Sequence, residues 1–225
     1  MTTLGLIGGG RIGGTVARLA VDAGLEVVLS NSRGPESLRE LIADLGSRAR
    51  ATGAQEAAEA GDIVVVCTPF RVYRTLPVAA LAGKVVLDTT NYNAQRDGAI
   101  PELDANSVTS SELLQAELPT SQVVKAFNTI FVTHLAALPR PAGAADRSAI
   151  PIAGDHDTAK TVAAELLDTL GYDTVDIGPL AESWRLRPGS PAYGVPYASG
   201  TPFWEHEAAP GDPATVRAAV EKAER

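Results

Sequence analysis

The sequence has little cysteine and a shortage of positive charge, and each shortage excludes a class of protein. The 225 residues include one cysteine, Cys67, so no disulfide can form within the chain and we expect a reducing compartment. Lys and Arg number 19 against 27 Asp and Glu, which gives a formal net charge of -8. We therefore predict no nucleic-acid partner, because phosphate contacts require a basic face.

Long apolar runs and metal-binding motifs are also missing. No stretch approaches the ~20 apolar residues of a membrane helix, so we predict no membrane partner. The N-terminus runs directly into "LGLIGGG" without a basic segment or cleavage pattern, so we expect no signal peptide and a cytoplasmic location. HExxH, CxxC and paired-carboxylate motifs are absent, and we predict no metal site.

What the sequence does contain is a regular alternation of strand and helix patterns. Apolar runs over 4–8, 26–30 and 62–69 predict buried strands, and helical spacing of apolar residues predicts helices over 11–23 and 35–46. Such alternation is typical of a parallel sheet covered by helices on both faces. We predict an α/β fold, a Rossmann-type doubly wound parallel sheet with a smaller C-terminal α/β extension.

The alternation is interrupted at residues 139–147, where Pro, Gly and Ala predict a domain boundary or a long loop. We therefore divide the chain into an N-terminal domain, 1–139, which carries the regular alternation, and a smaller C-terminal domain, 140–225. From residue 181 the chain is rich in proline and contains both tryptophans. It is too aromatic for a disordered linker, so we expect this tail to pack on the rest of the protein.

The first predicted strand ends in a glycine-rich loop that matches G-x-G-x-x-G and opens a predicted helix. In this setting Gly8 permits a tight turn, Gly10 lets the backbone approach a pyrophosphate, and Gly13 lets the helix pack closely on the strand. The helix N-terminus offers free N–H groups to the anion. We predict a dinucleotide cofactor here, with Arg11 and Ile12 of the same loop among its contacts.

The end of the second predicted strand distinguishes between two cofactors. NAD-binding proteins place an acidic residue there to hold the ribose hydroxyls. This chain has Ser30, Asn31, Ser32 and Arg33 instead. Hydroxyl, amide and guanidinium groups can donate to phosphate oxygens, so we predict NADP(H) rather than NAD.

The nicotinamide end of the cofactor should lie at the carboxyl ends of the later strands. Thr68 and Pro69 could border the ring, and Asn128 could hold its carboxamide. No catalytic residue is assigned, because Cys67 lies in a buried strand with nothing basic beside it. The complete set of candidates at these strand ends is Cys67, Thr68, Pro69, Phe70, Asn91, Ala126, Phe127 and Asn128.

No obvious proton donor accompanies these residues. His134 is the histidine nearest the candidate site in sequence, and we expect it to face solvent. A carbonyl reductase needs an acid, whereas hydride exchange between two cofactors depends mainly on the proximity of their rings. Because no clear proton donor is found, the sequence favours hydride exchange between two cofactors. Four tyrosines could nevertheless serve as proton donors, namely Tyr73, Tyr92, Tyr193 and Tyr197.

Taken together, these segments resemble the NADPH-dependent reductases of coenzyme F420, an 8-hydroxy-5-deazaflavin. The resemblance covers about residues 4–180, and "LSNSRGPESL" and "VVKAFNTI" are its most specific parts. It implies hydride transfer between NADP(H) and F420 as second substrate, in a cleft between an NADP-binding domain and a smaller domain, in a homodimer. It also implies that Ser32 and Arg33 hold the 2′-phosphate, and that Thr68, Pro69 and Asn128 lie at the nicotinamide. The pattern fades after Leu180.

Two other functions remain open. One is an NADPH-dependent reductase of a small imine or carbonyl compound, which a tyrosine from 193 or 197 reaching the cleft would favour. The other is a non-enzymatic NADP-binding sensor, which a cleft sealed by the segment from Trp184 to Trp204 would favour.

Overall fold

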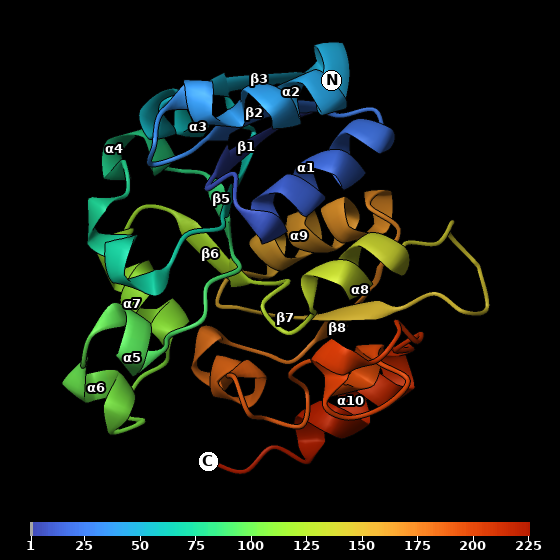
Figure 1. The fold of residues 1–225 in the computed structure, drawn as a ribbon. Coiled ribbons are helices and arrows are strands. Elements are labelled where there is room, and N and C mark those ends of the chain that lie inside the picture. Colours follow the sequence, from blue (N-terminus) through green and yellow to red (C-terminus); the bar gives the residue numbers. More distant parts are fainter. Residues whose placement is uncertain (1) are drawn as a thin grey trace.

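The computed structural model describes residues 2–225, and its centre is one eight-stranded sheet with the order β3-β2-β1-β4-β5-β6-β7-β8 (Figure 1). The strands are β1 (Thr3–Ile7), β2 (Glu26–Ser30), β3 (Ala49–Thr52), β4 (Ile63–Val66), β5 (Val85–Asp88), β6 (Gln122–Lys125), β7 (Ala149–Gly154) and β8 (Asp173–Asp176).

The first six strands are all parallel, in the order of a doubly wound dinucleotide-binding fold. The chain moves outward from β1 to β3, returns to place β4 beside β1, and then moves outward in the other direction. The carboxyl ends of β1 and β4 therefore flank the point at which the winding reverses. Ligands of open α/β sheets bind at that point.

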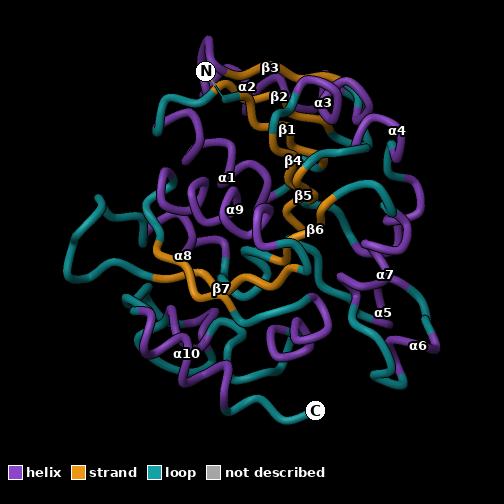
Figure 2. The backbone as a smooth tube through the Cα atoms, turned by 180° about the vertical axis from the view of Figure 1, so that it is seen from behind, coloured by secondary structure: helices purple, strands orange, loops and turns teal. Residues whose placement is uncertain are grey.

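Helices cover both faces of this sheet, as Figures 1 and 2 show from opposite sides. Helices α1, α8 and α9 lie on one face, and α4 and α7 lie on the other. The α-helices are α1 (Arg11–Asp22), α2 (Arg39–Leu45), α3 (Ala54–Ala60), α4 (Val78–Leu81), α5 (Ala94–Asp97), α6 (Pro101–Asp104), α7 (Ser110–Glu117), α8 (Val132–Ala137), α9 (Asp157–Thr169) and α10 (Pro213–Glu221). Short 3-10 helices span Pro35–Leu38, Gly46–Arg48, Phe70–Thr75, Leu180–Leu186, Val195–Tyr197 and Phe203–Glu205.

Two apolar cores follow from this layering. The larger joins α1 and α9 to the sheet through residues such as Val16, Leu29 and Leu167. The smaller lies under α4 and α7 and contains Phe70 and Leu114. The central strands are buried on both faces, which explains why their sequences are continuous apolar runs rather than alternating ones. The α/β Rossmann-type fold is thus confirmed.

The C-terminal extension continues the same sheet. β7 pairs antiparallel with β6, and β8 pairs parallel with β7. Residues 139–147 form the long connection that enters β7 in Figure 1. The predicted division into 1–139 and 140–225 falls at this connection and stays a prediction. The sheet itself is continuous across the division, because β6 before it is hydrogen-bonded to β7 after it.

The tail from residue 181 packs against the protein. The fully buried Tyr197 donates its hydroxyl to the Ala149 carbonyl at 2.9 Å, and the Gly194 amide donates to the Thr129 carbonyl at 2.7 Å. The longest α-helix that the structure describes, α9, has 13 residues, and none within 2–225 is long and apolar enough to cross a bilayer.

Candidate functional site

The glycine loop between β1 and α1 is built by close backbone contacts. The Gly8 and Gly9 amides both donate to the Ser30 carbonyl, at 3.1 and 2.8 Å. Gly8 has a φ of +114°, and a Cβ there would lie 2.5 Å from the Cys67 carbonyl oxygen. A Cβ on Gly13 would overlap the Gly8 carbonyl oxygen. Both positions require glycine, because α1 begins immediately beside the ends of β1 and β4.

The start of α1 is open to an anionic ligand. Its N-cap residue is Gly10, and no side chain caps the first N–H groups. A Cβ on Gly10 would meet nothing within 4 Å, so the space above the loop is free. Unpaired N–H groups and the positive end of the helix dipole favour a phosphate there.

The turn after β2 divides its four polar residues into two roles. Ser30 is buried, and its hydroxyl donates to the Leu6 carbonyl at 3.2 Å. The Asn31 Oδ1 accepts from the Arg33 amide at 3.3 Å, which shapes the turn. Ser32 and Arg33 are exposed. Within residues 2–225 the Arg33 guanidinium has no hydrogen-bond or ion-pair partner, so it is free to meet a ligand.

A cavity of about 530 Å³, here called the loop cavity, connects these parts. It runs from the Arg33 turn past the glycine loop to the turn after β4. Its walls are Ile7, Gly8, Gly9, Gly10, Ser30, Asn31, Ser32, Arg33, Ala54, Cys67, Thr68, Pro69, Arg71, Val72, Thr75, Leu76 and Pro77.

Of the predicted residues after β4, three line the loop cavity and one does not. Cys67, Thr68 and Pro69 lie in its wall, whereas Phe70 is fully buried and stacks on Tyr73 with 4.6 Å between ring centroids. Burial raises the pKa of Cys67 to about 12. Its thiol therefore stays protonated near neutral pH and is a poor nucleophile.

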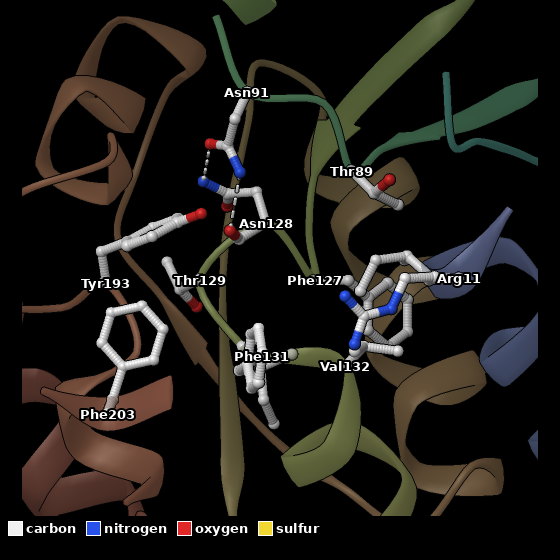
Figure 3. Close-up of a pocket in the computed structure, with 12 residues that line it drawn as sticks. Arg11, Thr89, Asn91, Phe127, Asn128, Thr129, Phe131, Val132, Tyr193 and Phe203 are labelled. Carbon is white, nitrogen blue, oxygen red and sulfur yellow. Dashed lines mark hydrogen bonds between the residues drawn. The ribbon is translucent and has the colours of Figure 1, made fainter. Parts of the chain in front are cut away.

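A second cavity of about 200 Å³, here called the strand-end cavity, lies at the carboxyl ends of β5 and β6 (Figure 3). Arg11, the first residue of α1, borders the strand-end cavity, whereas Gly8, Gly9 and Gly10 just before it border the loop cavity. The walls of the strand-end cavity are Arg11, Ile12, Thr89, Asn91, Phe127, Asn128, Thr129, Ile130, Phe131, Val132, Tyr193 and Phe203. Ala126 is buried in the core behind it and lines neither cavity.

Two asparagines form the floor of the strand-end cavity. Asn91 Nδ2 donates to the Asn128 carbonyl at 2.9 Å, and Asn128 Nδ2 donates to Asn91 Oδ1 at 3.1 Å. Asn128 Nδ2 also donates to the Leu186 carbonyl at 2.7 Å, which fixes the tail to the sheet. Phe127, at a φ of +61°, turns the chain so that its ring is buried beside this pair. A bulky residue in that backbone region is strained, a feature that concentrates at functional sites.

Several buried polar atoms at these strand ends have no partner within the protein. They include Thr68 Oγ1 after β4, Thr90 Oγ1 after β5, and Asn128 Oδ1 and Thr129 Oγ1 after β6. Buried polar atoms are nearly always hydrogen-bonded, so the unpaired atoms of Thr68 and Asn128, which line the two cavities, can pair with a ligand there. Asn128 Oδ1 is an acceptor, suited to an amide N–H such as that of a carboxamide.

A buried ion pair lies at the ends of β5 and β6, next to the strand-end cavity. Lys125 Nζ lies 3.0 Å from Asp88 Oδ2, and both side chains are at most 3% exposed. Asp88 also accepts from the Ser111 hydroxyl and the Thr90 amide, both at 2.8 Å, and Lys125 donates to the Thr90 carbonyl. With all partners engaged, this pair holds the ends of β5 and β6 together.

The C-terminal tail forms one wall of the strand-end cavity, through Tyr193 and Phe203, which were not among the predicted site residues. Phe203 makes edge-to-face contacts with Phe131 and Tyr193, with centroid distances of 5.9 and 5.7 Å. The Arg11 guanidinium lies 5.7 Å from the Phe131 ring centre. Aromatic enrichment after residue 181 was the available signal, but the partner surface could not be identified from it.

The titratable groups near the site differ in availability. His134, expected at the surface, is 2% exposed, and its Nε2 donates to the His206 carbonyl at 3.0 Å. Tyr92 donates to Asp104, and Tyr197 is engaged as described. Tyr193 borders the strand-end cavity, where its phenol points toward the Asn91–Asn128 pair (Figure 3). Within residues 2–225 no cluster of three or more His, Cys, Asp or Glu side chains could hold a metal ion.

Comparison with known proteins gives a family for the part of the chain that holds the loop cavity. Residues 3–92 match the family model described as NADP oxidoreductase, coenzyme F420-dependent. These residues belong to that family. They contain the glycine loop, the Arg33 turn and the strand end at Thr68, so the chain is an NAD(P)-binding Rossmann protein of an oxidoreductase family.

Individual relatives are similar to this protein over most of its chain. The hypothetical protein SMa0349 of Sinorhizobium meliloti is 30% identical, with a TM-score of 0.73 over 84% of this chain and 91% of that chain. A protein of Arthrobacter sp. FB24, described provisionally as an F420-dependent NADP-reductase, is 26% identical, with a TM-score of 0.67 over 81% and 87% of the two chains. Metalloreductase STEAP3 of Rattus norvegicus is 29% identical over 182 residues. Those residues are 80% of this chain but only 34% of STEAP3, so the chain spans about a third of that relative.

The residues of the loop cavity fit NADP(H). The open start of α1 suits a pyrophosphate, and the unpaired Arg33 guanidinium beside Ser32 suits a further phosphate. No carboxylate lines the cavity near the turn after β2, where one would repel a 2′-phosphate.

Proposed function

We propose that this protein transfers a hydride between NADP(H) in the loop cavity and the deazaflavin coenzyme F420, whose ring is received by the strand-end cavity. The observation that carries the proposal is the position of two cavities beside the start of α1, the loop cavity at the reversal point of the sheet and the strand-end cavity at the ends of β5 and β6. NADPH supplies the hydride when it is bound.

The residues of the chain have separate tasks in this proposal. The first N–H groups of α1 bind the pyrophosphate, and Ser32 and Arg33 bind the 2′-phosphate. Asn128 lines the strand-end cavity rather than the loop cavity, and its buried Oδ1 without a partner accepts a hydrogen bond from the nicotinamide carboxamide where the cofactor reaches from one cavity to the other. Thr68 and Pro69 border the ring at the end of the loop cavity nearest to β4.

Support for a deazaflavin comes from the walls of the strand-end cavity. Phe131 and Phe203 offer aromatic surface to a planar ring, and Arg11 offers a positive charge to an electron-rich one. The cavity is smaller than the ~300 Å³ at which pockets for drug-sized molecules begin. It would therefore hold one end of the coenzyme, with the rest extending toward solvent.

Steady-state oxidation of NADPH with oxidised F420 as acceptor tests the proposal. We expect rapid turnover that fails when NADH replaces NADPH. Tight NADPH binding without F420 reduction would contradict the choice of acceptor while leaving the cofactor assignment in place.

A second candidate is an NADPH-dependent reductase of a small imine or carbonyl compound. It is favoured by the small volume of the strand-end cavity and by the position of Tyr193 in its wall. Turnover of a small cyclic imine at a higher kcat/KM than F420 would support this candidate over the first.

A further inference from the structure

The reduction of either acceptor requires a proton as well as a hydride. The hydride carries two electrons and one hydrogen to an acceptor carbon, and NADPH becomes NADP⁺. The conjugated nitrogen or oxygen of the acceptor then gains charge and must receive a proton from a nearby acid. The comparisons and the sequence assign no residue to that step.

Most of the acids around the two cavities are already engaged. Lys125 is held by Asp88 and by the Thr90 carbonyl, and His134 donates its Nε2 proton to a tail carbonyl. The Cys67 thiol lines the loop cavity and not the strand-end cavity, so it does not face the acceptor. Arg11 reaches the strand-end cavity, but a guanidinium does not deprotonate in proteins.

The five tyrosines are distinguished by their hydroxyl groups and positions. Tyr172 and Tyr197 are buried and donate to the carbonyls of Leu135 and Ala149. Tyr73 lies in the core against Phe70, and Tyr92 donates to Asp104. Tyr193 remains as the tyrosine whose phenol borders the strand-end cavity.

We propose that Tyr193 is the catalytic acid that protonates the acceptor as the hydride arrives. The proton leaves Tyr193 Oη for the acceptor heteroatom, and the resulting phenolate regains a proton from solvent water. In the reverse direction the phenolate removes the same proton. This inference rests on the proposed hydride transfer and adds the source of its proton.

The surroundings of Tyr193 suit this task. Its ring makes an edge-to-face contact with Phe203, and its backbone N–H donates to the Ser190 carbonyl at 3.0 Å, so the ring and the backbone that carries it each have a fixed neighbour. Burial raises the pKa of Tyr193, and the nearby Arg96 guanidinium of α5 opposes that shift. The phenol is therefore protonated at neutral pH, and Arg96 stabilises the phenolate once the proton has left. Arg96 does not line the strand-end cavity, and Arg11 is the charged side chain among the residues that do.

The decisive experiment is a single-turnover measurement of F420 reduction by NADPH-loaded protein, comparing the wild type with Tyr193→Phe. The substitution keeps the ring contact with Phe203 and removes only the hydroxyl. We expect a rate loss of about 100-fold or more, as is typical for loss of a general acid. The affinity for F420, measured by quenching of its fluorescence, should change by less than about tenfold, the effect of one neutral hydrogen bond.

The pH dependence of the rate gives a readout that a packing role would not produce. The wild-type rate should stay level from neutral pH and fall only above pH 10, where the phenol loses its proton, and Tyr193→Phe should lose that fall. Tyr73→Phe is the matched control, since Tyr73 is buried in the core and lines neither cavity, and its rate should equal that of the wild type. A wild-type rate in Tyr193→Phe would overturn the assignment of Tyr193. Absence of F420 reduction by the wild type itself would instead overturn the proposed acceptor.

Discussion

Replacement of Arg33 by alanine tests the choice of NADP(H) over NAD(H) most directly. The guanidinium is exposed and has no partner within residues 2–225, so its removal breaks no contact inside the protein. A hydrogen bond to a charged group contributes about 1.5–3 kcal/mol, and each 1.4 kcal/mol is a factor of ten in affinity. The Kd of NADPH should therefore rise about 10- to 100-fold, while the Kd of NADH should stay constant, because NADH has no 2′-phosphate.

Equilibrium titration of both cofactors, followed by cofactor fluorescence, measures these constants. Arg39→Ala is the matched control, since Arg39 is an exposed arginine at the start of α2 that lines neither cavity. Because the Arg33 contact is at the surface, the preference for NADPH should also weaken as salt is added. Equal losses of affinity for NADPH and NADH would refute the 2′-phosphate role of Arg33.

Further predictions concern the framework of the site. Gly13→Ala should destabilise the fold by about 3 kcal/mol and weaken both cofactors alike, because its Cβ overlaps the Gly8 carbonyl oxygen; thermal denaturation and cofactor titration would measure both effects. Lys125→Met should cost about 3–5 kcal/mol in urea denaturation, because Asp88 would stay buried without its counter-ion, and adding Asp88→Leu should recover part of that loss. Burial raises the pKa of Cys67 from 9.0 to about 12, so the folded protein holds a proton that the unfolded chain releases as pH rises through this range. Stability should therefore fall between those pH values by more in the wild type than in Cys67→Ala, and equal falls would contradict the buried thiol.

The grouping of residues around the loop cavity could be predicted from the sequence because its determinants are local. The tight turn at Gly8, the close packing at Gly13 and the turn that exposes Arg33 each depend on residues near one another in the chain. The order of strands then follows from the regular alternation of strand and helix. Even here the sequence did not separate Ser30, whose hydroxyl stays with the Leu6 carbonyl, from the exposed Ser32 beside it.

The strand-end cavity depends on contacts that no local pattern encodes. Asn91 and Asn128 meet because β5 and β6 are neighbours, and Asn128 reaches Leu186 across 58 residues of sequence. The sequence predicts His134 at the surface, but the C-terminal tail covers it and accepts its hydrogen bond through the His206 carbonyl. Phe70 follows a strand end as a ligand-binding residue would, yet its size and its stacking on Tyr73 place it in the core.

The wall between the strand-end cavity and the outer surface is a single layer of aromatic rings. Tyr193 and Phe203 border that cavity on one side and, on the other, a surface groove of about 300 Å³ beside the exposed Val195 and Trp204. Shortening either ring would merge the two spaces without touching a residue of the glycine loop. Under the proposed function, the range of acceptors and the choice of nicotinamide coenzyme can therefore change independently, since a late segment of the chain borders the strand-end cavity and the first third of the chain lines the loop cavity.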